Sequence, residues 1–444
     1  MADLMKEQPQ EPAWAALAAI DWADQKHFWR WAAVESNRQE QGEMDNTPEA
    51  VDAWAMELHQ RFGGRPIAVC LEQSRGSLVC LLAKYPHLVL FPVHPKTAAQ
   101  YRETFCPSGA KSDPSDTASL LDLLQRHREK LRQLRPDTVE TRLLQMLVET
   151  RRLIVNEKTR QKNRLTACLK IFFPQILKWF DAVDAPLVGA LLRRWGSLRE
   201  LQRAHPGTLR KFFNQQNCRD EERIQERIAG IQQAVPATED AAIVEGHSRR
   251  ARTLVAMIDT LRNQIVEYDR RIAELVESHP EGSLFGSLPG AGPVLTPRLI
   301  VAFGTRRERF ASAEEVQRLS GIAPVTEKSG KSQYVHMRRA CPKFLRQTFH
   351  EFADHSIAQS GWAKAYYEMQ RAKGNNHHAA VRSLGYKWIR IIFRCWKDGR
   401  PYDEETYVRS LQRRNSPLFS ASATTTGAGW KTVAGFQKFS ANPS

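Results

Sequence analysis

The stretch RPIAVCLEQSRGSLVCLLAKYPHLVLFPV, residues 65–93, decides the fold class of the first part of this chain. Two short apolar runs, 65–73 and 87–93, flank a helix-like segment at 77–85. Short apolar runs of this length are typical of buried strands, and their alternation with helical segments is typical of α/β domains. We therefore expect an α/β domain here.

The residues on either side extend this pattern. A strand candidate, AALAAIDW (15–22), is followed by an aromatic run, KHFWRWAAV (26–34), that we expect to be its hairpin partner. Thr47 and Pro48 are a suitable N-cap and first position for a helix over 48–62, and a third helix is expected over 96–105. The order of these elements predicts a three-layer α/β domain over residues 12–125.

No strand pattern persists beyond residue 112, and helices are expected almost to residue 280. Residues 126–170 contain 13 Lys and Arg against five Asp and Glu, so a basic helical arm is expected over 126–280. Within it, apolar residues follow the 4-3-4-3 spacing of a coiled-coil seam. The spacing leaves open whether this seam pairs with the upstream helix or with another protomer. The seam consists of Leu254, Ile258, Leu261, Ile265, Tyr268, Ile272 and Leu275.

A break at HPEGSLFGSLPGAGP (279–293) opens a last, α-rich domain, expected over 281–412. In it, Trp388 and Trp396 lie eight residues apart on one helix, and we expect them in the core. Residues 413–444 are rich in Ser, Thr, Gly and Ala and contain no acidic residue, so we expect a disordered tail.

Charge is distributed unevenly along the 444 residues. Residues 1–118 contain 11 Lys and Arg against 16 Asp and Glu, a net charge of −5. Because the whole chain carries +16, residues 119–444 must carry +21. An acidic domain joined to a strongly basic remainder predicts a polyanionic partner, since Lys and Arg bind phosphates by releasing condensed counterions.

Several classes of protein are disfavoured by the sequence. No apolar run approaches the roughly 18 residues that a membrane-spanning helix needs, and the start has no basic segment before an apolar core. The seven cysteines are scattered without a CxxC pair, which disfavours a zinc knuckle or a disulfide framework. We expect a cytoplasmic protein without a membrane partner.

Four carboxylates are candidates for a metal site. Asp21 and Glu72 end two strand candidates, and strand ends in an α/β sheet border the crevice where ligands bind. Asp113 and Asp116, three residues apart at a helix start, share one face. Hard Mg²⁺ prefers such oxygen ligands, and two ions can assist phosphoryl transfer.

Each of these acids has an alternative interpretation. Asp24 lies in the same turn region as Asp21 and could replace it. Asp113 or Asp116 could simply cap the helix. For Glu72 the alternative is weaker, because an acid at the end of a buried strand is costly without a partner.

The last domain contains two further motifs. PGAGP before an apolar helix indicates a helix-hairpin-helix-like element, whose glycines permit close backbone approach and whose helix N-terminus can bind phosphate. About 40 residues later, KSGKS places Ser329 between two lysines in a polar segment expected to be a loop. By itself, a Ser-Gly pair of this kind is usually a turn.

Together these motifs resemble those of a class of bacterial insertion-sequence transposases. Relatives of this class include the Piv-type DNA invertases, and some of its members are bridge-RNA-guided recombinases. The resemblance covers roughly 15–120 and 285–403. It is most specific in HPKTAAQYRETFCPSGAKSDPSD (94–116) and resumes at LPGAGPVLTPRLIVAFG (288–304). It implies an RNase H-like (RuvC-like) domain in which Asp21, Glu72, Asp113 and Asp116 bind metal, expected to be two Mg²⁺ ions, or Mn²⁺.

The resemblance also implies a serine that attacks the DNA backbone. Ser329 matches it best and Ser332 is the fallback, because KSGKS is shorter than the Ser- and Gly-rich stretch that relatives often have. Lys328, Lys331, Arg338 and Arg339 are then expected to contact nucleic acid. Double-stranded DNA, an element-encoded guide RNA and further copies of the chain, in a dimer or tetramer, are the implied partners.

Two other functions remain open from the sequence. One is a RuvC-like nuclease or junction resolvase that uses water instead of serine as nucleophile. The other is a nucleic-acid scaffold without catalysis, in which the acidic residues only cap helices. The transposase is the function that we predict.

Overall fold

The computed structural model describes residues 13–36, 38–105, 112–330 and 332–418. The chain divides into two compact units, one up to Pro136 and one from Asp137 onward. Of the predicted tail, residues 419–444 lie outside the described residues, whereas Leu418 is buried.

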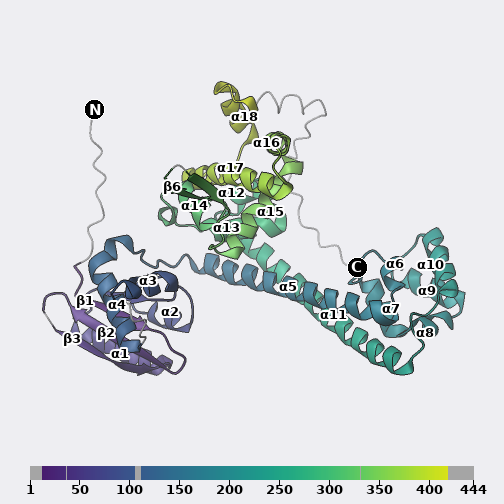
Figure 1. The fold of residues 1–444 in the computed structure, drawn as a ribbon, viewed down its shortest axis with the longest axis horizontal. Helices are drawn as coiled ribbons and strands as arrows, with labels where there is room; N and C mark the ends of the chain where they lie inside the picture. The colour runs from purple at the N-terminus through teal and green to yellow at the C-terminus, as the bar shows by residue number, and fades with distance from the viewer. Residues whose placement is uncertain (1–12, 37, 106–111, 331, 419–444) are drawn as a thin grey trace. The chain divides into compact units, whose positions relative to one another are not determined.

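A five-stranded sheet in the order β3-β2-β1-β4-β5 forms the first unit (Figure 1). β1 pairs antiparallel with β2 and parallel with β4; β2–β3 is antiparallel and β4–β5 parallel. Four of the strands match the predicted ones, and the sheet is consistent with the implied RuvC-like domain. Their bounds are β1 Ala16–Asp21, β2 Lys26–Ala33, β3 Gln39–Asp45, β4 Ile67–Leu71 and β5 Leu88–Pro92.

The prediction missed β3. Its sequence, QEQGEMD, is polar except for Gly42 and Met44, because β3 is an edge strand on which only Met44 is buried. A polar strand of this kind shows no hydrophobic pattern, and its pairing with β2 is what makes it a strand.

Helices cover both faces of this sheet. One core contains Ala16, Ala18 and Ile20 of β1 together with side chains of α1 (Pro48–Arg61) and α2 (Ser77–Leu82). The opposite core contains Leu17 and Ala19 with side chains of α3 (Pro95–Phe105) and α4 (Asp113–His127). The predicted three-layer α/β domain is confirmed. Thr47 caps α1 as expected, accepting a hydrogen bond of 3.2 Å from the Ala50 amide.

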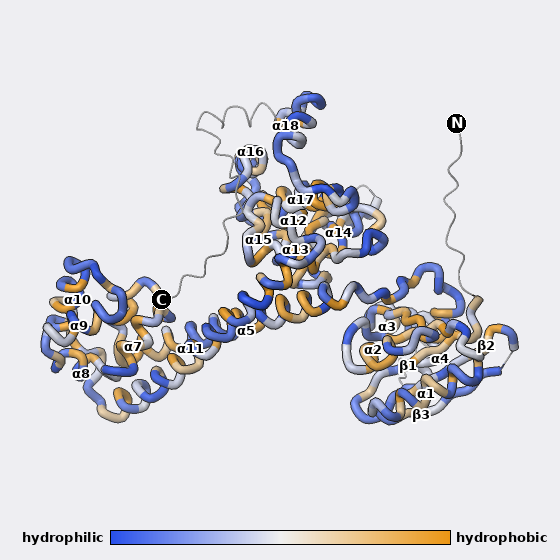
Figure 2. Tube along the Cα trace, turned by 180° about the vertical axis from the view of Figure 1, so that it is seen from behind, coloured by the Kyte–Doolittle hydropathy of each residue, from blue (hydrophilic) through white to orange (hydrophobic). Residues whose placement is uncertain are grey.

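The second unit contains two long helices, α5 (Val139–Phe172) and α11 (Ala241–Ser278). Leu144 near the start of α5 shares a core with Ile272 near the end of α11, and Leu169 shares another with Leu254, so the helices run antiparallel. Figure 2 shows both helices alternating between hydrophilic and hydrophobic colours along their length, as amphipathic helices do. The seam on α11 thus packs on the upstream helix, with Leu261, Ile265 and Tyr268 only half-buried.

Five short helices between α5 and α11 form a small domain around the core that contains Leu169. They are α6 (Ile176–Trp179), α7 (Pro186–Arg194), α8 (Leu198–Gln202), α9 (Pro206–Gln215) and α10 (Glu221–Gln233).

The described remainder of the second unit, up to residue 418, is mainly helical, as predicted, and contains one hairpin of two strands, β6 (Val325–Ser329) and β7 (Ser332–His336). Trp388 and Trp396 are fully buried, which confirms their predicted place in the core. The helices are α12 (Gly282–Gly286), α13 (Gly292–Phe303), α14 (Ala313–Leu319), α15 (Lys343–Gln359), α16 (Gly361–Ala372), α17 (His377–Asp398) and α18 (Glu404–Arg413).

Candidate functional site

Asp21 and Glu72 lie at the ends of two neighbouring strands. Asp21 is the last residue of β1, and Glu72 directly follows β4. The parallel register pairs Ile20 with Leu71, so the two acids continue the register side by side. Side chains alternate along a strand, and Ala19 and Cys70 belong to the core under α3 and α4. Both acids, which are half-buried, therefore belong to the face of the sheet that α3 and α4 cover.

The start of α4 brings a third acid to this face. Asp116, in the first turn of α4, is 4% exposed, whereas Asp113 is exposed. The helix is capped by Ser112, which accepts from the Ser115 amide in a capping box. Neither aspartate is therefore the N-cap, and the simple capping interpretation of Asp113 or Asp116 is wrong.

Asp24, the alternative to Asp21, is exposed in the turn between β1 and β2. Its carbonyl accepts a hydrogen bond of 3.0 Å from the Asn46 side chain, which fixes the turn. The adjacent His27 is buried and bonded to the same asparagine at 3.1 Å; burial lowers the pKa of His27. Because Asp24 follows the end of β1 by three residues, Asp21 is the better placed acid.

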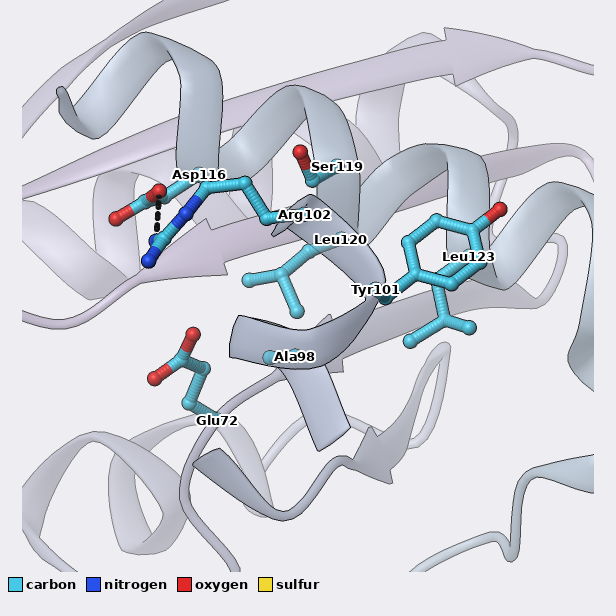
Figure 3. A pocket seen from close by; sticks show the side chains of 8 residues that line it. All are labelled: Glu72, Ala98, Tyr101, Arg102, Asp116, Ser119, Leu120 and Leu123. Carbon is cyan, nitrogen blue, oxygen red and sulfur yellow. Dashed lines mark hydrogen bonds and ion pairs between the residues drawn. The ribbon is translucent and has the colours of Figure 1, made fainter. Parts of the chain in front are cut away.

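A cation not singled out from the sequence lies among these acids. Arg102 of α3 forms an ion pair with Asp116 at 2.5 Å, with side chains 17% and 3% exposed. Figure 3 shows Glu72 facing the same small pocket, which Tyr101, Ser119 and Leu120 also line. The hydrogen bond to Asp116, with smaller contributions from nearby Glu72, raises the pKa of Arg102, so it stays charged. The sequence does not distinguish Arg102 from other arginines on predicted helices, because only the packing of α3 on α4 brings Arg102 to Asp116.

The donor set suits a hard divalent cation, since carboxylate oxygens come from β1, from the residue after β4 and from α4. In the described ranges, however, no three His, Cys, Asp or Glu side chains form a group that could hold a metal ion. The guanidinium of Arg102 is hydrogen-bonded to Asp116 in this arrangement. The carboxylates therefore fit a divalent metal by their chemistry, while Asp116 is paired with Arg102.

The second unit places Ser329 at the tip of the β6–β7 hairpin rather than in a loop. Ser329 and Ser332 are the last cross-strand pair, and Gly330 takes a left-handed φ of 57° in the turn between them. Such a turn favours glycine because it has no Cβ. Both serines are exposed.

The basic residues near the serine differ in accessibility. Lys328 on β6 and Arg339 after β7 are exposed, whereas Arg338 is half-buried. Lys331 lies outside the described residues. Arg298 is buried and paired with Glu351, so it cannot contact DNA in this arrangement.

The PGAGP segment connects α12 and α13 through a tight turn. Gly290 has φ of 83°, and a Cβ there would lie 2.9 Å from the backbone carbon of His355 in α15. Gly290 therefore permits a close approach of this turn to α15, and this packing accounts for a glycine at the position.

No helix in the described ranges combines the length and apolar character needed to cross a bilayer.

Two sequence profiles match the chain. Residues 18–174 match a profile described as a transposase, the DEDD domain of IS110, and residues 282–368 match one described as the IS116/IS110/IS902 family of transposases. The first contains all four candidate carboxylates and the second contains Ser329. A DEDD domain of this type indicates dependence on a divalent metal.

Curated relatives cover most of the chain. The mini-circle transposase assigned to IS117 of Streptomyces coelicolor is 25% identical over 82% of this chain and 87% of its own length. A 43.6 kDa protein of insertion element IS110 from the same organism is 27% identical, over 67% of this chain and 73% of its own. A 42 kDa protein of IS900 from Mycobacterium paratuberculosis is 25% identical over 80% and 84%. Taken with the α/β domain and its strand-end acids, these matches identify the chain as a DNA transposase of the IS110/IS116/IS902 family of insertion sequences.

Proposed function

We propose that this transposase cuts and rejoins DNA strands through Ser329, assisted by divalent metal ions at Asp21, Glu72, Asp113 and Asp116. The observation that carries the proposal is that Asp21, Glu72 and buried Asp116 all belong to the face of the sheet that α3 and α4 cover. Acids gathered in this way repel one another unless cations balance them. Bound Mg²⁺ or Mn²⁺ would supply that charge and Lewis-acid stabilisation of a reacting phosphate.

The proposed step at Ser329 replaces each phosphodiester bond that is broken with another phosphoester bond. The serine Oγ forms a bond to the phosphorus, the bond from phosphorus to one sugar oxygen breaks, and the serine proton passes to solvent or to the leaving oxygen. A sugar hydroxyl of the new strand then displaces the serine. No oxidant or nucleotide is needed, because each phosphodiester lost is replaced by another phosphoester.

Within the hairpin, His336 and Glu327 form an ion pair at 3.5 Å, and neither is hydrogen-bonded to Ser329. His336 lies four residues along β7 from Ser332, the cross-strand partner of Ser329. At about 3.3 Å per residue this separation is about 13 Å. Activation is therefore assigned to the carboxylate domain, from the same or another copy of the chain.

We also propose that the transposase works as a homo-oligomer, a dimer or tetramer, with an element-encoded guide RNA. Apolar residues on α5 support the oligomer. Val139, Leu143, Met146 and Leu153 are all exposed, although 4-3-7 spacing puts them on one stripe of the helix. The guide RNA is supported by the resemblance and by the net charge of +21 outside the first 118 residues.

The serine proposal can be tested by trapping the protein on its DNA ends, digesting the complex and mapping the phosphoserine peptide by mass spectrometry. The peptide containing Ser329 is expected. Ser329→Ala should abolish strand exchange, while Ser332→Ala should retain most of it. If both variants exchange strands at the wild-type rate, water is the nucleophile and the protein acts as a RuvC-like nuclease or resolvase.

The carboxylate proposal predicts that Asp21→Asn and Glu72→Gln each lower DNA cleavage in Mg²⁺ by at least about 100-fold, the size of effect typical of losing a transition-state contact. Asp24→Asn, three residues from Asp21 and exposed, is the matched control and should cleave normally. Unchanged cleavage in both Asp21→Asn and Glu72→Gln would contradict the metal site.

A further inference from the structure

The β6–β7 hairpin exposes apolar side chains on both of its faces. Tyr334 is 67% exposed and Val335 60% exposed, and as neighbours in β7 they point to opposite faces. Every described residue of the hairpin except Val325 is exposed. A two-stranded ribbon with neither face covered is marginally stable alone, so a partner that surrounds it would stabilise it.

The charge of the hairpin selects the partner. Residues 325–343 contain Lys328, Lys331, Arg338, Arg339 and Lys343 against Glu327 as the one acid. This balance favours a polyanion over an apolar protein surface. A DNA major groove, about 12 Å wide, admits a two-stranded β-ribbon.

We propose that the β6–β7 hairpin enters the major groove of the DNA substrate, where Tyr334 and Val335 contact the DNA. This inference rests on the DNA substrate of a transposase and not on Ser329 being its nucleophile. The apolar faces would contact base edges such as thymine methyl groups, while Lys328 and Arg339 would contact phosphates.

A binding measurement on the full chain tests the groove without any strand exchange. With a fluorescein-labelled 40-base-pair duplex, Tyr334→Ala and Val335→Ser should each weaken binding about tenfold, the loss of one good groove contact. Val266→Ser on α11, where the valine is 62% exposed, is the matched control and should bind like wild type. Methyl green, a major-groove ligand, should compete with wild type, and netropsin, a minor-groove ligand, should not.

Three outcomes would overturn the inference. Binding unchanged in both hairpin variants would exclude the hairpin from the interface. Competition by netropsin alone would place the protein in the minor groove. Weakened self-association of the hairpin variants with unchanged DNA binding would show that another copy of the chain covers the hairpin. A serine-to-alanine variant that binds but does not react would count only against the serine proposal.

A separate observation concerns Arg102. Its guanidinium pairs with Asp116, which is almost fully buried, and it lines the same pocket as Glu72. Figure 3 shows the Arg102–Asp116 pair and Glu72 around one pocket. Arg102 of α3 thus supplies positive charge to Asp116 from within the chain.

We infer that Arg102 is a latch on the carboxylate site: its guanidinium holds Asp116 until a divalent cation displaces it. The inference rests on the proposed metal site. Metal loading would then require α3 to release Asp116, so the ion competes with an internal cation for the same acid. Arg102 is a positioning residue in this scheme.

Mn²⁺ binding to the full chain without DNA, followed by the electron paramagnetic resonance of free Mn²⁺, tests the latch. Arg102→Gln should bind Mn²⁺ about tenfold more tightly than wild type, because a charge-assisted hydrogen bond no longer competes. Arg102→Lys keeps the charge and should stay closer to wild type. Arg126→Gln is the matched control, since Arg126 also pairs with an aspartate of α4, Asp122, at 2.6 Å.

The two possible failures can be told apart. If Arg102→Gln binds no more tightly than wild type while Asp116→Asn abolishes binding, the latch is wrong and the metal site stands. If neither Asp116→Asn nor Glu72→Gln affects Mn²⁺ binding, the metal site is wrong and the latch with it. Thermal unfolding of each variant verifies that the α/β unit is folded.

Discussion

At the scale of single residues, the basic side chains of the second unit serve different purposes. Arg298 of α13 has a side chain only 9% exposed. Its Nε donates to Thr348 at 3.1 Å and its guanidinium pairs with Glu351, both on α15. Desolvation alone raises the pKa of Glu351, but the hydrogen bond from Arg298 and other favourable contacts lower it overall. Arg298 thus joins two helices of the core.

Replacing Arg298 with Ala should lower the free energy of unfolding of the second unit by about 2 kcal/mol, because it removes the ion pair and leaves the half-buried Glu351 carboxylate with the hydrogen bond from Gln347. Urea unfolding measures this. Arg394→Ala is the matched control: Arg394 is 82% exposed and pairs with Asp398 on α17, so its loss should cost less than about 0.5 kcal/mol. Equal effects of the two substitutions would contradict the structural role of Arg298.

Residue chemistry visible in the sequence was also sufficient to choose Asp21 and Glu72, since both end apolar runs. It was not sufficient for Arg102. An arginine on a helix is usually solvated, and only the contact between α3 and α4 shows that this one pairs with a buried acid.

At the scale of elements, His279 joins the end of α11 to the start of α5. Its Nδ1 accepts from the Glu281 amide at 3.1 Å, so the proton resides on Nε2, which donates to Thr141 of α5 at 3.0 Å. Burial lowers the pKa of His279, although Glu281, Asp137 and Glu140 act in the opposite direction. The neutral ring is therefore the form that stabilises this junction.

A lowered pKa in the folded state makes the stability of this junction depend on pH. The unfolded chain binds a proton at His279 more readily, so the contribution is complete above about pH 6.5 and is lost as the pH falls toward the folded pKa. We expect thermal stability to fall between pH 7.5 and 5.5, and to fall less in His279→Gln. Parallel curves for the two proteins would show that other groups cause the pH dependence.

The helical elements were predicted more completely than the strands of the second unit. The apolar seam on α11 is visible in the sequence, because the buried face of a helix appears as apolar residues that recur at helical spacing. The β6–β7 hairpin has no buried face, so the sequence KSGKS predicts a loop there. Its pairing, Val325 with His336 through Ser329 with Ser332, becomes visible only in three dimensions.

At the scale of the whole molecule, several apolar side chains of α5 remain exposed within one chain. Val139, Leu143, Met146 and Leu153 are 37–69% exposed along α5, on the helix that also packs against α11. Exposed apolar stripes of this kind mark interfaces.

Met146→Glu with Leu153→Glu should convert the proposed homo-oligomer to monomer, because charge in an apolar interface is costly. Size-exclusion chromatography with light scattering measures the mass. Val235→Glu, at a valine 76% exposed outside the long helices, is the control and should leave the mass unchanged. An oligomer that persists in the double variant with an unaltered mass would exclude this stripe from the interface.

The sequence by itself determined the α/β domain, its strand-end acids Asp21 and Glu72, the capped start of α1 and the amphipathic seam of α11. These features depend on hydrophobic periodicity and on residues close together along the chain, which a sequence displays directly. The tertiary structure alone decided the polar edge strand β3, the ribbon that presents Ser329 and the pairing of Arg102 with Asp116. Each of these depends on contacts between elements, and such contacts leave no periodic signal in either partner.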